Sequence, residues 1–369
     1  MRTAIWRHFD FWLLGAVAVL IAFGIAMISS AIAGNAELIE LDILGRQITY
    51  SLAGVGIILI AATLDYRLWV SVSRVLYVIL ALLLGVIVVF GGTEAFGAQR
   101  WLNVGLIIFQ PSELAKIVMI IILADYFARN RDAVHDLKWI ARSAALTLGL
   151  TILILLQPNL STSIVLMTVW FSLLFASGLK LKHLATFMFV GLLIVIIGFP
   201  FLQDYQQQRV ISFLFPDPEA RYGANYNVTQ SLISIGSGGL LGQGYGQSSQ
   251  VQLRFLKVRH NDFIFSAISA EFGLVGAITV LGILFFIIWR CVRAAQLSQD
   301  AFGSLIAYGV AVSIALHTIV NVGMNIQLLP VTGLPLPFIS AGGSSLLTFM
   351  FGIGLVESVV ARHRALNFS

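Results

Sequence analysis

The chain has little charge and almost no cysteine, and both shortages limit what it can be. Of its 369 residues 11% are charged, whereas an ordinary soluble domain carries about 25%. The single cysteine, Cys291, cannot form a disulfide within the chain, and no cluster of cysteine and histidine suggests a zinc site. The composition therefore excludes an ordinary soluble domain and a fold built on disulfides.

What is abundant is apolar sequence, since 59% of the residues are hydrophobic. They gather into runs of about 20 residues, the length that crosses a bilayer as a helix. We therefore predict an all-α, polytopic membrane protein with a single domain over residues 1–369 and about ten transmembrane helices. The predicted spans lie near residues 11–32, 47–64, 70–91, 111–128, 141–156, 160–178, 183–202, 262–289, 302–326 and 341–361, with the fifth and sixth separated only by a turn at 157–159.

Basic residues in the short connections give the orientation. In a ten-span arrangement they all fall on one side of the membrane, which the positive-inside rule assigns to the cytoplasm. Both termini are then cytoplasmic, and the net charge of +5 reflects topology, so no nucleic-acid partner is expected. The residues concerned are Arg2, Arg7, Arg67, Arg74, Arg129, Arg131, Lys138, Arg142, Lys180, Lys182, Arg290, Arg293, Arg362 and Arg364.

A long connection between the seventh and eighth spans, residues 203–261, is predicted to lie outside the cytoplasm. Connections of this length are usually functional or disordered. This one is rich in glycine, glutamine, serine and aromatic residues, so we expect it to be ordered against the helices. Its segment 236–246 is dense in glycine but follows no predicted strand, which favours a tight loop packed on the bundle over a phosphate-binding loop. A contact between its amides and a pyrophosphate stays open.

Asp262 stands where this polar connection turns into the eighth span. A carboxylate at the head of a membrane helix is costly to desolvate and therefore needs a reason to be there. One interpretation is that Asn261 or Asp262 caps the helix by accepting bonds from its free N–H groups. The other is that Asp262 is a catalytic base at the boundary between water and membrane. The residues themselves leave both interpretations open.

Charged residues elsewhere suggest a polar cavity. Pro111 suits a first helical turn, and Glu113 and Lys116 then lie three apart on one face of the fourth span. They form either a neutralising ion pair or part of a cavity for an anionic or sugar substrate. Arg209 and Arg259 in the long connection would suit an anionic ligand such as a lipid pyrophosphate. His260 is either a second acid–base group or a structural histidine.

Five segments occur in an order that resembles one family. GAQRW, FQPSELAK, QSLISIGSGGLLGQGYG, HNDFIFSAISAEFGLVG and GLPLPFISAGGSS are similar to the SEDS family, the shape, elongation, division and sporulation proteins, over nearly the whole chain. The residues 204–210 and 253–260 resemble the elongation members more than the division members. The resemblance implies a peptidoglycan glycosyltransferase that polymerises lipid II for cell elongation and rod shape. It also implies a bacterial cytoplasmic membrane, an active site on the extracytoplasmic face and a class B penicillin-binding protein as partner.

The same resemblance implies roles for individual residues. The family's essential aspartate matches Asp262, which we predict to be catalytic. The predicted substrate-binding residues are Arg100, Glu113, Lys116, Gln157, Arg209, Arg259, His260 and Ser344. The chain departs from the family's pattern at Asn159, where an aspartate is usual, and at Lys257 and Ala341, where proline and tyrosine are usual. No cofactor is required by the sequence and no protein metal site is predicted, although a divalent cation could share the work on the leaving group.

Three alternatives remain at this level. The chain could be a transporter of lipid II or another amphiphile, a scaffold without catalysis, or the division or sporulation member of the same family. Against transport, the candidate polar residues cluster at the outer face, whereas alternating access places a site near the midplane.

Overall fold

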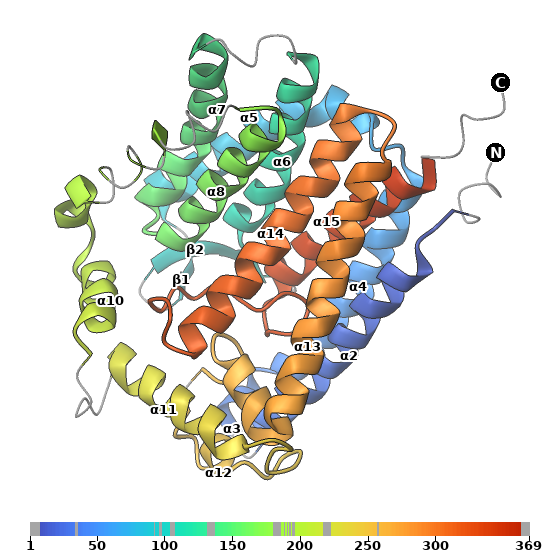
Figure 1. Cartoon of the computed structure of the whole chain (residues 1–369). Helices are drawn as coiled ribbons and strands as arrows, with labels where there is room; N and C mark the ends of the chain where they lie inside the picture. Colours follow the sequence, from blue (N-terminus) through green and yellow to red (C-terminus); the bar gives the residue numbers. More distant parts are fainter. Residues whose placement is uncertain are drawn as a thin grey trace.

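The computed structural model describes residues 8–33, 36–91, 93–95, 98–103, 108–130, 137–179, 186–187, 189, 191, 193, 196–216, 223–256 and 258–362. Within them the chain is a bundle of long helices, as predicted (Figure 1). The long helices are α2 (Phe11–Ile32), α4 (Ile43–Thr63), α5 (Leu68–Phe90), α6 (Pro111–Arg129), α7 (Leu137–Leu156), α8 (Leu160–Ala176), α13 (Ile264–Leu297), α14 (Ala301–Asn325) and α15 (Gly343–Arg362). Shorter helices are α3 (Ala36–Glu40), η2 (Phe199–Phe201), α10 (Asp204–Leu214), α11 (Gly223–Gly238) and α12 (Ser249–Gln252).

The predicted spans match these helices closely. In the described part of the chain seven helices are long and apolar enough to cross a membrane, so the protein is a multi-pass membrane protein. Two more predicted spans are the helices α6, which carries Glu113, Lys116 and Asp125, and α8, which has 17 residues. The predicted span 183–202 lies partly outside the described residues, so the count of ten stays a prediction. The turn at 157–159 is confirmed, because α7 ends at Leu156 and α8 begins at Leu160.

A small antiparallel sheet, which the sequence did not predict, precedes α6. It consists of β1 (Thr93–Ala95), β2 (Ala98–Asn103) and β3 (Ile108–Phe109) in the order β1-β2-β3. The strand β3 leads directly into Gln110 and the first turn of α6, where Pro111 occupies a position whose N–H needs no helical partner. The sheet therefore fixes the direction in which α6 starts.

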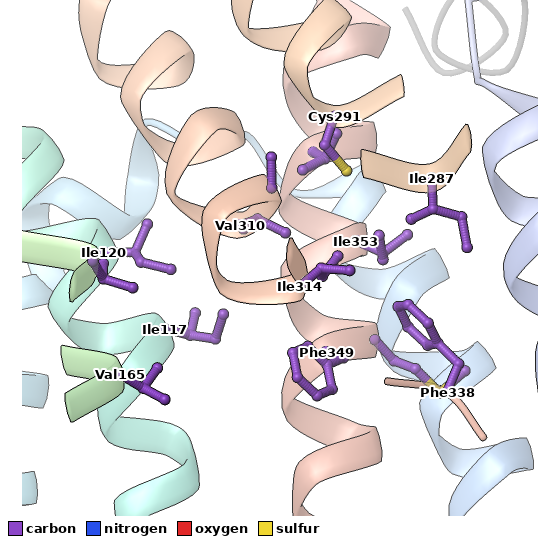
Figure 2. Packing of buried hydrophobic residues seen from close by; sticks show 14 of the residues in the cluster. Ile117, Ile120, Val165, Ile287, Cys291, Val310, Ile314, Phe338, Phe349 and Ile353 are labelled. Carbon is purple, nitrogen blue, oxygen red and sulfur yellow. The ribbon is translucent and has the colours of Figure 1, made fainter. Parts of the chain in front are cut away.

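The centre of the bundle is formed by α6, α14 and α15. The most apolar stretch of α15 is 83% buried, whereas that of α5 is 22% buried, so α5 lies at the periphery with its apolar face available to lipid. Figure 2 shows side chains from α6, α8, α13, α14 and α15 packed on one another, among them Ile117, Val165, Ile287, Ile314 and Phe349. Such an interior holds the helices in a fixed arrangement, so polar groups at their ends have fixed positions.

One end of the bundle collects charged residues that pair with one another; we call it the basic end. There α2 begins and α15 ends, since the Asp10 N–H donates to Glu357 Oε2 at 3.0 Å. Arg290 pairs with Asp10, Arg67 Nη2 lies 2.8 Å from Asp300 Oδ2, and Arg362 Nε lies 3.6 Å from Asp65 Oδ2. The predicted gathering of these arginines at one end is confirmed. Which side of the membrane this end faces stays a prediction.

The helix α13 is longer than the predicted span and is broken at Gly273, whose φ of 66° and ψ of −163° are not helical. The glycine-rich loop 239–244 supplies the hydrogen bonds that the break removes. Gln243 N and Gly244 N donate to Ala270 O and Glu271 O, each at 3.0 Å, and Gly239 O and Leu240 O accept from Leu274 N and Val275 N at 2.9 and 3.1 Å. A Cβ at Gly242 would lie 2.1 Å from Glu271 O, so the contact requires glycine. The prediction of a tight loop packed on the bundle is confirmed.

Candidate active site

Asp262 lies in the turn that precedes α13, at the end of the bundle opposite the basic end. The N-cap of α13 is Phe263, and no side chain of the turn caps the helix. Among the residues that the structure describes, no group donates a hydrogen bond to the carboxylate of Asp262. The interpretation of Asp262 as a helix cap is therefore wrong.

The cap of α13 comes instead from another helix. Oδ1 of Asn325, in the last turn of α14, accepts the Ser266 N–H at 3.2 Å and the Ser266 hydroxyl at 2.5 Å. Ser266 is the third residue of α13, and its N–H is one that an ordinary N-cap side chain would bind. Because Asn325 satisfies it, the neighbouring carboxylate of Asp262 remains available for other chemistry.

The surroundings of Asp262 favour a proton acceptor near neutral pH. Burial raises the pKa of Asp262 to about 6, and the charge of Arg209 on α10 opposes that rise. Gly333 faces the carboxylate, since a Cβ built on it would lie 3.7 Å from Oδ2. A base with a pKa slightly below the working pH is ionised and still accepts a proton readily. Such a pKa suits the predicted role of Asp262 as a general base, and that role stays a prediction.

The backbone next to Gly333 holds Arg209 near Asp262. Arg209 Nη1 donates to Thr332 O at 3.3 Å, and the Ser161 hydroxyl of α8 donates to the same oxygen at 2.5 Å. Thr332 directly precedes Gly333. The long connection, α8 and the segment before α15 thus meet beside the carboxylate.

Arg259 and His260 lie in the same turn, and both are short of partners. Arg259 is 4% exposed and donates Nη1 to Leu256 O at 3.4 Å, whereas its Nε and Nη2 have no partner among the described residues. Burial, with the charge of Arg254, lowers the pKa of Arg259. Burial also lowers the pKa of His260 to about 4, with the charge of Arg259 adding to the effect. At pH 7 His260 is therefore neutral. The buried guanidinium of Arg259, which has unused donors, is suited to binding an anion.

Glu113 and Lys116 form the predicted ion pair, with Lys116 Nζ 2.8 Å from Glu113 Oε2. The pair has a third member, because Lys116 Nζ also lies 3.0 Å from Nε2 of His317 on α14. His317 Nδ1 lies 2.8 Å from Ser313 O, which only accepts, so Nδ1 carries the proton and Nε2 accepts from the lysine. Lys116 is 0% exposed. The pairing is observed, and its part in substrate binding stays a prediction.

The remaining predicted residues occupy different surroundings. Gln157 donates to Leu84 O at 3.0 Å and Ser344 accepts from Gln110 N at 3.0 Å, so both support the backbone around the site. Arg100 stands in β2, and its side chain lies outside the described part. Asn159 caps α8 through Thr162 N at 3.3 Å and donates to the Ser112 hydroxyl at 3.2 Å. In that second bond the Ser112 hydroxyl accepts, whereas beside the family's usual aspartate it would have to donate.

Sequence reasoning missed three residues of α14 that border this region, His317, Asn321 and Asn325. They are spaced four apart, so they form one polar stripe on an otherwise apolar helix. One end of the stripe reaches Lys116, and the other reaches the turn that carries Asp262. Polar residues four apart within a membrane span usually face the interior of a bundle, and that spacing was the signal available in the sequence.

Within the described ranges, no group of three or more histidine, cysteine, aspartate and glutamate side chains could hold a metal ion. The carboxylate of Asp262, the partly buried Arg209 whose charge acts on it, and the buried Arg259 of the same turn are groups suited to proton transfer and anion binding.

Two named relatives are similar to almost the whole chain. The chain is 36% identical over 353 residues to the peptidoglycan glycosyltransferase MrdB of Escherichia coli K12, covering 95% of this chain and 94% of that protein. It is 35% identical to the probable peptidoglycan glycosyltransferase FtsW of Thioalkalivibrio sulfidiphilus, covering 96% and 90%.

Two solved structures have the same fold. A chain from a peptidoglycan synthase complex that coordinates polymerization and crosslinking has a TM-score of 0.82 and 30% identity, with 96% of this chain and 98% of that chain covered. The rod shape-determining protein RodA of Thermus thermophilus has a TM-score of 0.72 and 28% identity, with 98% of both chains covered. The family model of the FtsW, RodA and SpoVE cell cycle proteins matches residues 11–365, and this chain belongs to that family, the SEDS family.

Proposed function

We propose that this protein is a peptidoglycan glycosyltransferase of the elongation type, which polymerises lipid II into β-1,4-linked glycan strands for rod shape. The relatives named above support the activity, since they are peptidoglycan glycosyltransferases by name and match almost the whole chain. The observation that carries the assignment of the site is the carboxylate of Asp262, which is partly buried, free of hydrogen bonds from described residues and raised in pKa.

The reaction joins two lipid-linked disaccharide-peptides. The 4-hydroxyl oxygen of the acceptor sugar attacks the anomeric carbon of the donor, a new C–O bond forms, and the bond from that carbon to the pyrophosphate breaks. Asp262 accepts the hydroxyl proton, and the pyrophosphate leaves with the bonding electron pair. Because the donor is α-linked and the product is β-linked, one inverting displacement is sufficient. A positioned base contributes about 10²–10⁴ to such a rate.

The leaving undecaprenyl pyrophosphate carries several negative charges that need cationic partners. Arg259 supplies the unused Nε and Nη2 donors of a buried guanidinium, and Arg209 lies on the side of Asp262 lined by Thr332. Charge-assisted bonds of this kind stabilise a developing anion most strongly where water is excluded. Lys116 is held by Glu113 and His317, so we assign it to the cavity wall. Arg100 completes the proposed set of cations.

The site's setting follows from the two ends of the bundle. We place the basic end in the cytoplasm and the Asp262 end on the extracytoplasmic face of the bacterial cytoplasmic membrane, where lipid tails would lie between helices. The synthase complex with the similar chain supports a partner synthase, which we propose to be a class B penicillin-binding protein.

The activity is tested with the purified chain and labelled lipid II in detergent, with and without the class B penicillin-binding protein. We expect labelled polymer that lengthens with time and grows in amount when the partner is present. The same reactions with added magnesium or with a chelator measure any need for a divalent cation. Failure of both the chain and the complex to form polymer would overturn the proposal, and movement of intact lipid II in sealed vesicles would then favour transport.

The orientation is tested with single cysteines in a Cys291→Ala background. Leu253→Cys lies beyond α12 and Gln299→Cys lies at the basic end, and both positions are exposed. An impermeant thiol reagent applied to intact cells should label the first and not the second. Equal labelling of both from outside would contradict the proposed topology.

A further inference from the structure

Two amide side chains hold the backbone of Asp262. Nδ2 of Asn321 and Nδ2 of Asn325 each donate to the carbonyl oxygen of Asp262, both at 3.1 Å. The two asparagines are 0% exposed and lie one helical turn apart on α14. A carbonyl oxygen has two lone pairs, and both are used here. The peptide that carries the proposed base is therefore fixed to a central helix of the bundle.

Each asparagine makes a second bond that fixes one flank of the same turn. Asn321 Nδ2 also donates to Leu334 O at 2.8 Å, next to the Gly333 that faces the carboxylate. Asn325 Oδ1 accepts the Ser266 N–H and hydroxyl at the start of α13. The side chains of Asn321 and Asn325 thus hold three segments in fixed relative positions: the segment before α15, the first turn of α13 and the turn of Asp262.

Three further contacts close this frame. The Ser340 hydroxyl donates to Asn261 O at 2.9 Å, and Ala341 N donates to His260 O at 3.0 Å. From the long connection, the Ser231 hydroxyl of α11 donates to Asn325 O at 2.7 Å. The backbone carbonyl oxygens of residues 260–262 therefore all accept hydrogen bonds. The side-chain carboxylate of Asp262 accepts none from the described residues.

We propose that Asn321 and Asn325 are positioning residues for the glycosyl transfer, which place the carboxylate of Asp262 against the attacking hydroxyl. The inference rests on the proposed function. Between the fixed carbonyl and the carboxylate oxygens only two side-chain torsions remain, so fixing the peptide restricts the base to a small volume. A general base must lie within about 2.6–3.2 Å of its partner oxygen, and a misplacement of about 1 Å can cost about 10²-fold in rate.

The choice of amides has a chemical reason. A donor bound to the carboxylate itself would stabilise the charged form and weaken the base. These amides are neutral and bind the carbonyl instead, so they orient Asp262 without neutralising it. Loss of either amide should consequently lower the turnover number while leaving the affinity for lipid II and the pH at which activity is lost nearly unchanged.

The test uses Asn321→Ala, Asn325→Ala and the double variant in the purified protein, with labelled lipid II as substrate and rates normalised to folded protein. We expect each single change to lower kcat about tenfold or more, with KM within about twofold and the same midpoint of the pH profile. Thr318→Ala is the matched control, because Thr318 is buried on the same helix and, among the described residues, its hydroxyl bonds only to Ile314 O at 2.9 Å. It should keep the parent's kcat.

If the alanine variants do not fold, Asn321→Leu and Asn325→Leu keep the branched shape and lose both polar atoms. A kcat for the asparagine variants equal to that of Thr318→Ala would overturn the positioning role. So would a loss of kcat that disappears when the rate is divided by the folded fraction. Asp262→Asn in the same assay separates the two proposals. If it polymerises normally, the proposed base fails; if it is inactive while the asparagine variants are fully active, only the positioning role fails.

Discussion

Asp262 and Asp300 stand before consecutive helices, α13 and α14, yet they are bound very differently. Asp300 Oδ1 caps α14 through Gly303 N at 2.7 Å, and Oδ2 accepts from Tyr66 at 2.6 Å and from Arg67 at 2.8 Å. Burial raises the pKa of Asp300, but these bonds outweigh it and the pKa is lowered. The carboxylate of Asp262 accepts no bond from the described residues, and its pKa is raised to about 6.

The comparison shows how a carboxylate with a structural role differs from one whose lone pairs are free to accept a proton. At the basic end, lone pairs are used by donors, so the carboxylate stabilises the fold and is a poor base. At the other end, the bonds that a helix start needs are supplied by Asn325, and the lone pairs of Asp262 are left unused. The two aspartates share a position before a helix, so that position says little about what each carboxylate does. The number of hydrogen-bond donors to the carboxylate distinguishes the two.

The largest effect is expected from Asp262→Asn. Asparagine has nearly the same shape and cannot accept the hydroxyl proton at neutral pH. Polymerisation by this variant should fall by about 10² or more, while lipid II binding and the complex with the partner are kept. The measurement is polymer formed per folded protein from labelled lipid II. Normal polymerisation by Asp262→Asn would remove the base from the mechanism.

A second large effect is expected where charge is buried on α6. Glu113→Gln or Lys116→Met alone leaves one charge in the bundle without its partner, which costs about 3–5 kcal/mol. The double variant should recover much of that loss, giving a strongly non-additive cycle in both thermal unfolding and polymerisation. His317 remains a neutral acceptor in the tautomer described above, so it cannot replace the carboxylate.

The same helix provides the control. Arg129 Nε lies 2.6 Å from Asp125 Oδ1, but the arginine side chain is 55% exposed. Exposed pairs one turn apart contribute about 0.3–0.5 kcal/mol, so the cycle of Asp125→Asn and Arg129→Gln should be close to additive. If the Glu113–Lys116 cycle were equally additive, the two side chains would not be coupled and their proposed place in the cavity wall would fail.

The features that the sequence did predict depend on neighbours along the chain. Pro111 marks the start of α6 and the 157–159 turn separates α7 from α8, because a proline and a cap act within one helical turn. The break at Gly273 was not predicted, since its missing bonds come from a loop some 30 residues earlier. Nor was the cap on α13, which Asn325 supplies from another helix. Asp262 was identified, but its freedom from capping required the structure.

A smaller effect is expected from pH, and its sign follows from the raised pKa of Asp262. As a base, Asp262 must be ionised, so activity should fall about tenfold per pH unit below pH 6. His260, with its pKa lowered to about 4, remains neutral over that range. The measurement is the initial polymerisation rate between pH 5 and pH 8. Constant activity down to pH 5 would contradict a base with this pKa.

The same pKa predicts a difference in stability. Because the pKa of Asp262 is higher in the folded protein than its ordinary value of 3.8, its contribution to stability is full below pH 3.8. It is lost as pH rises through about 6. At pH 7.5 the ionised group therefore destabilises the fold, and Asp262→Asn should be more stable than the parent, by at most about 3 kcal/mol. Thermal unfolding of both at pH 7.5 and pH 4 should show a gap that narrows in acid.

The smallest effect is expected at Asp300, and it completes the comparison. Asp300→Ala removes the cap of α14 and should lower stability by about 1 kcal/mol. Asp300→Asn keeps a capping oxygen for Gly303 N and loses the bonds that Oδ2 accepts from Tyr66 and the exposed Arg67, so its cost should be of the same order. Both variants should polymerise lipid II at the parent's rate per folded protein. An Asp300→Asn variant as inactive as Asp262→Asn would show that the asparagine change harms any helix start in this bundle, and the contrast between the two aspartates would lose its meaning.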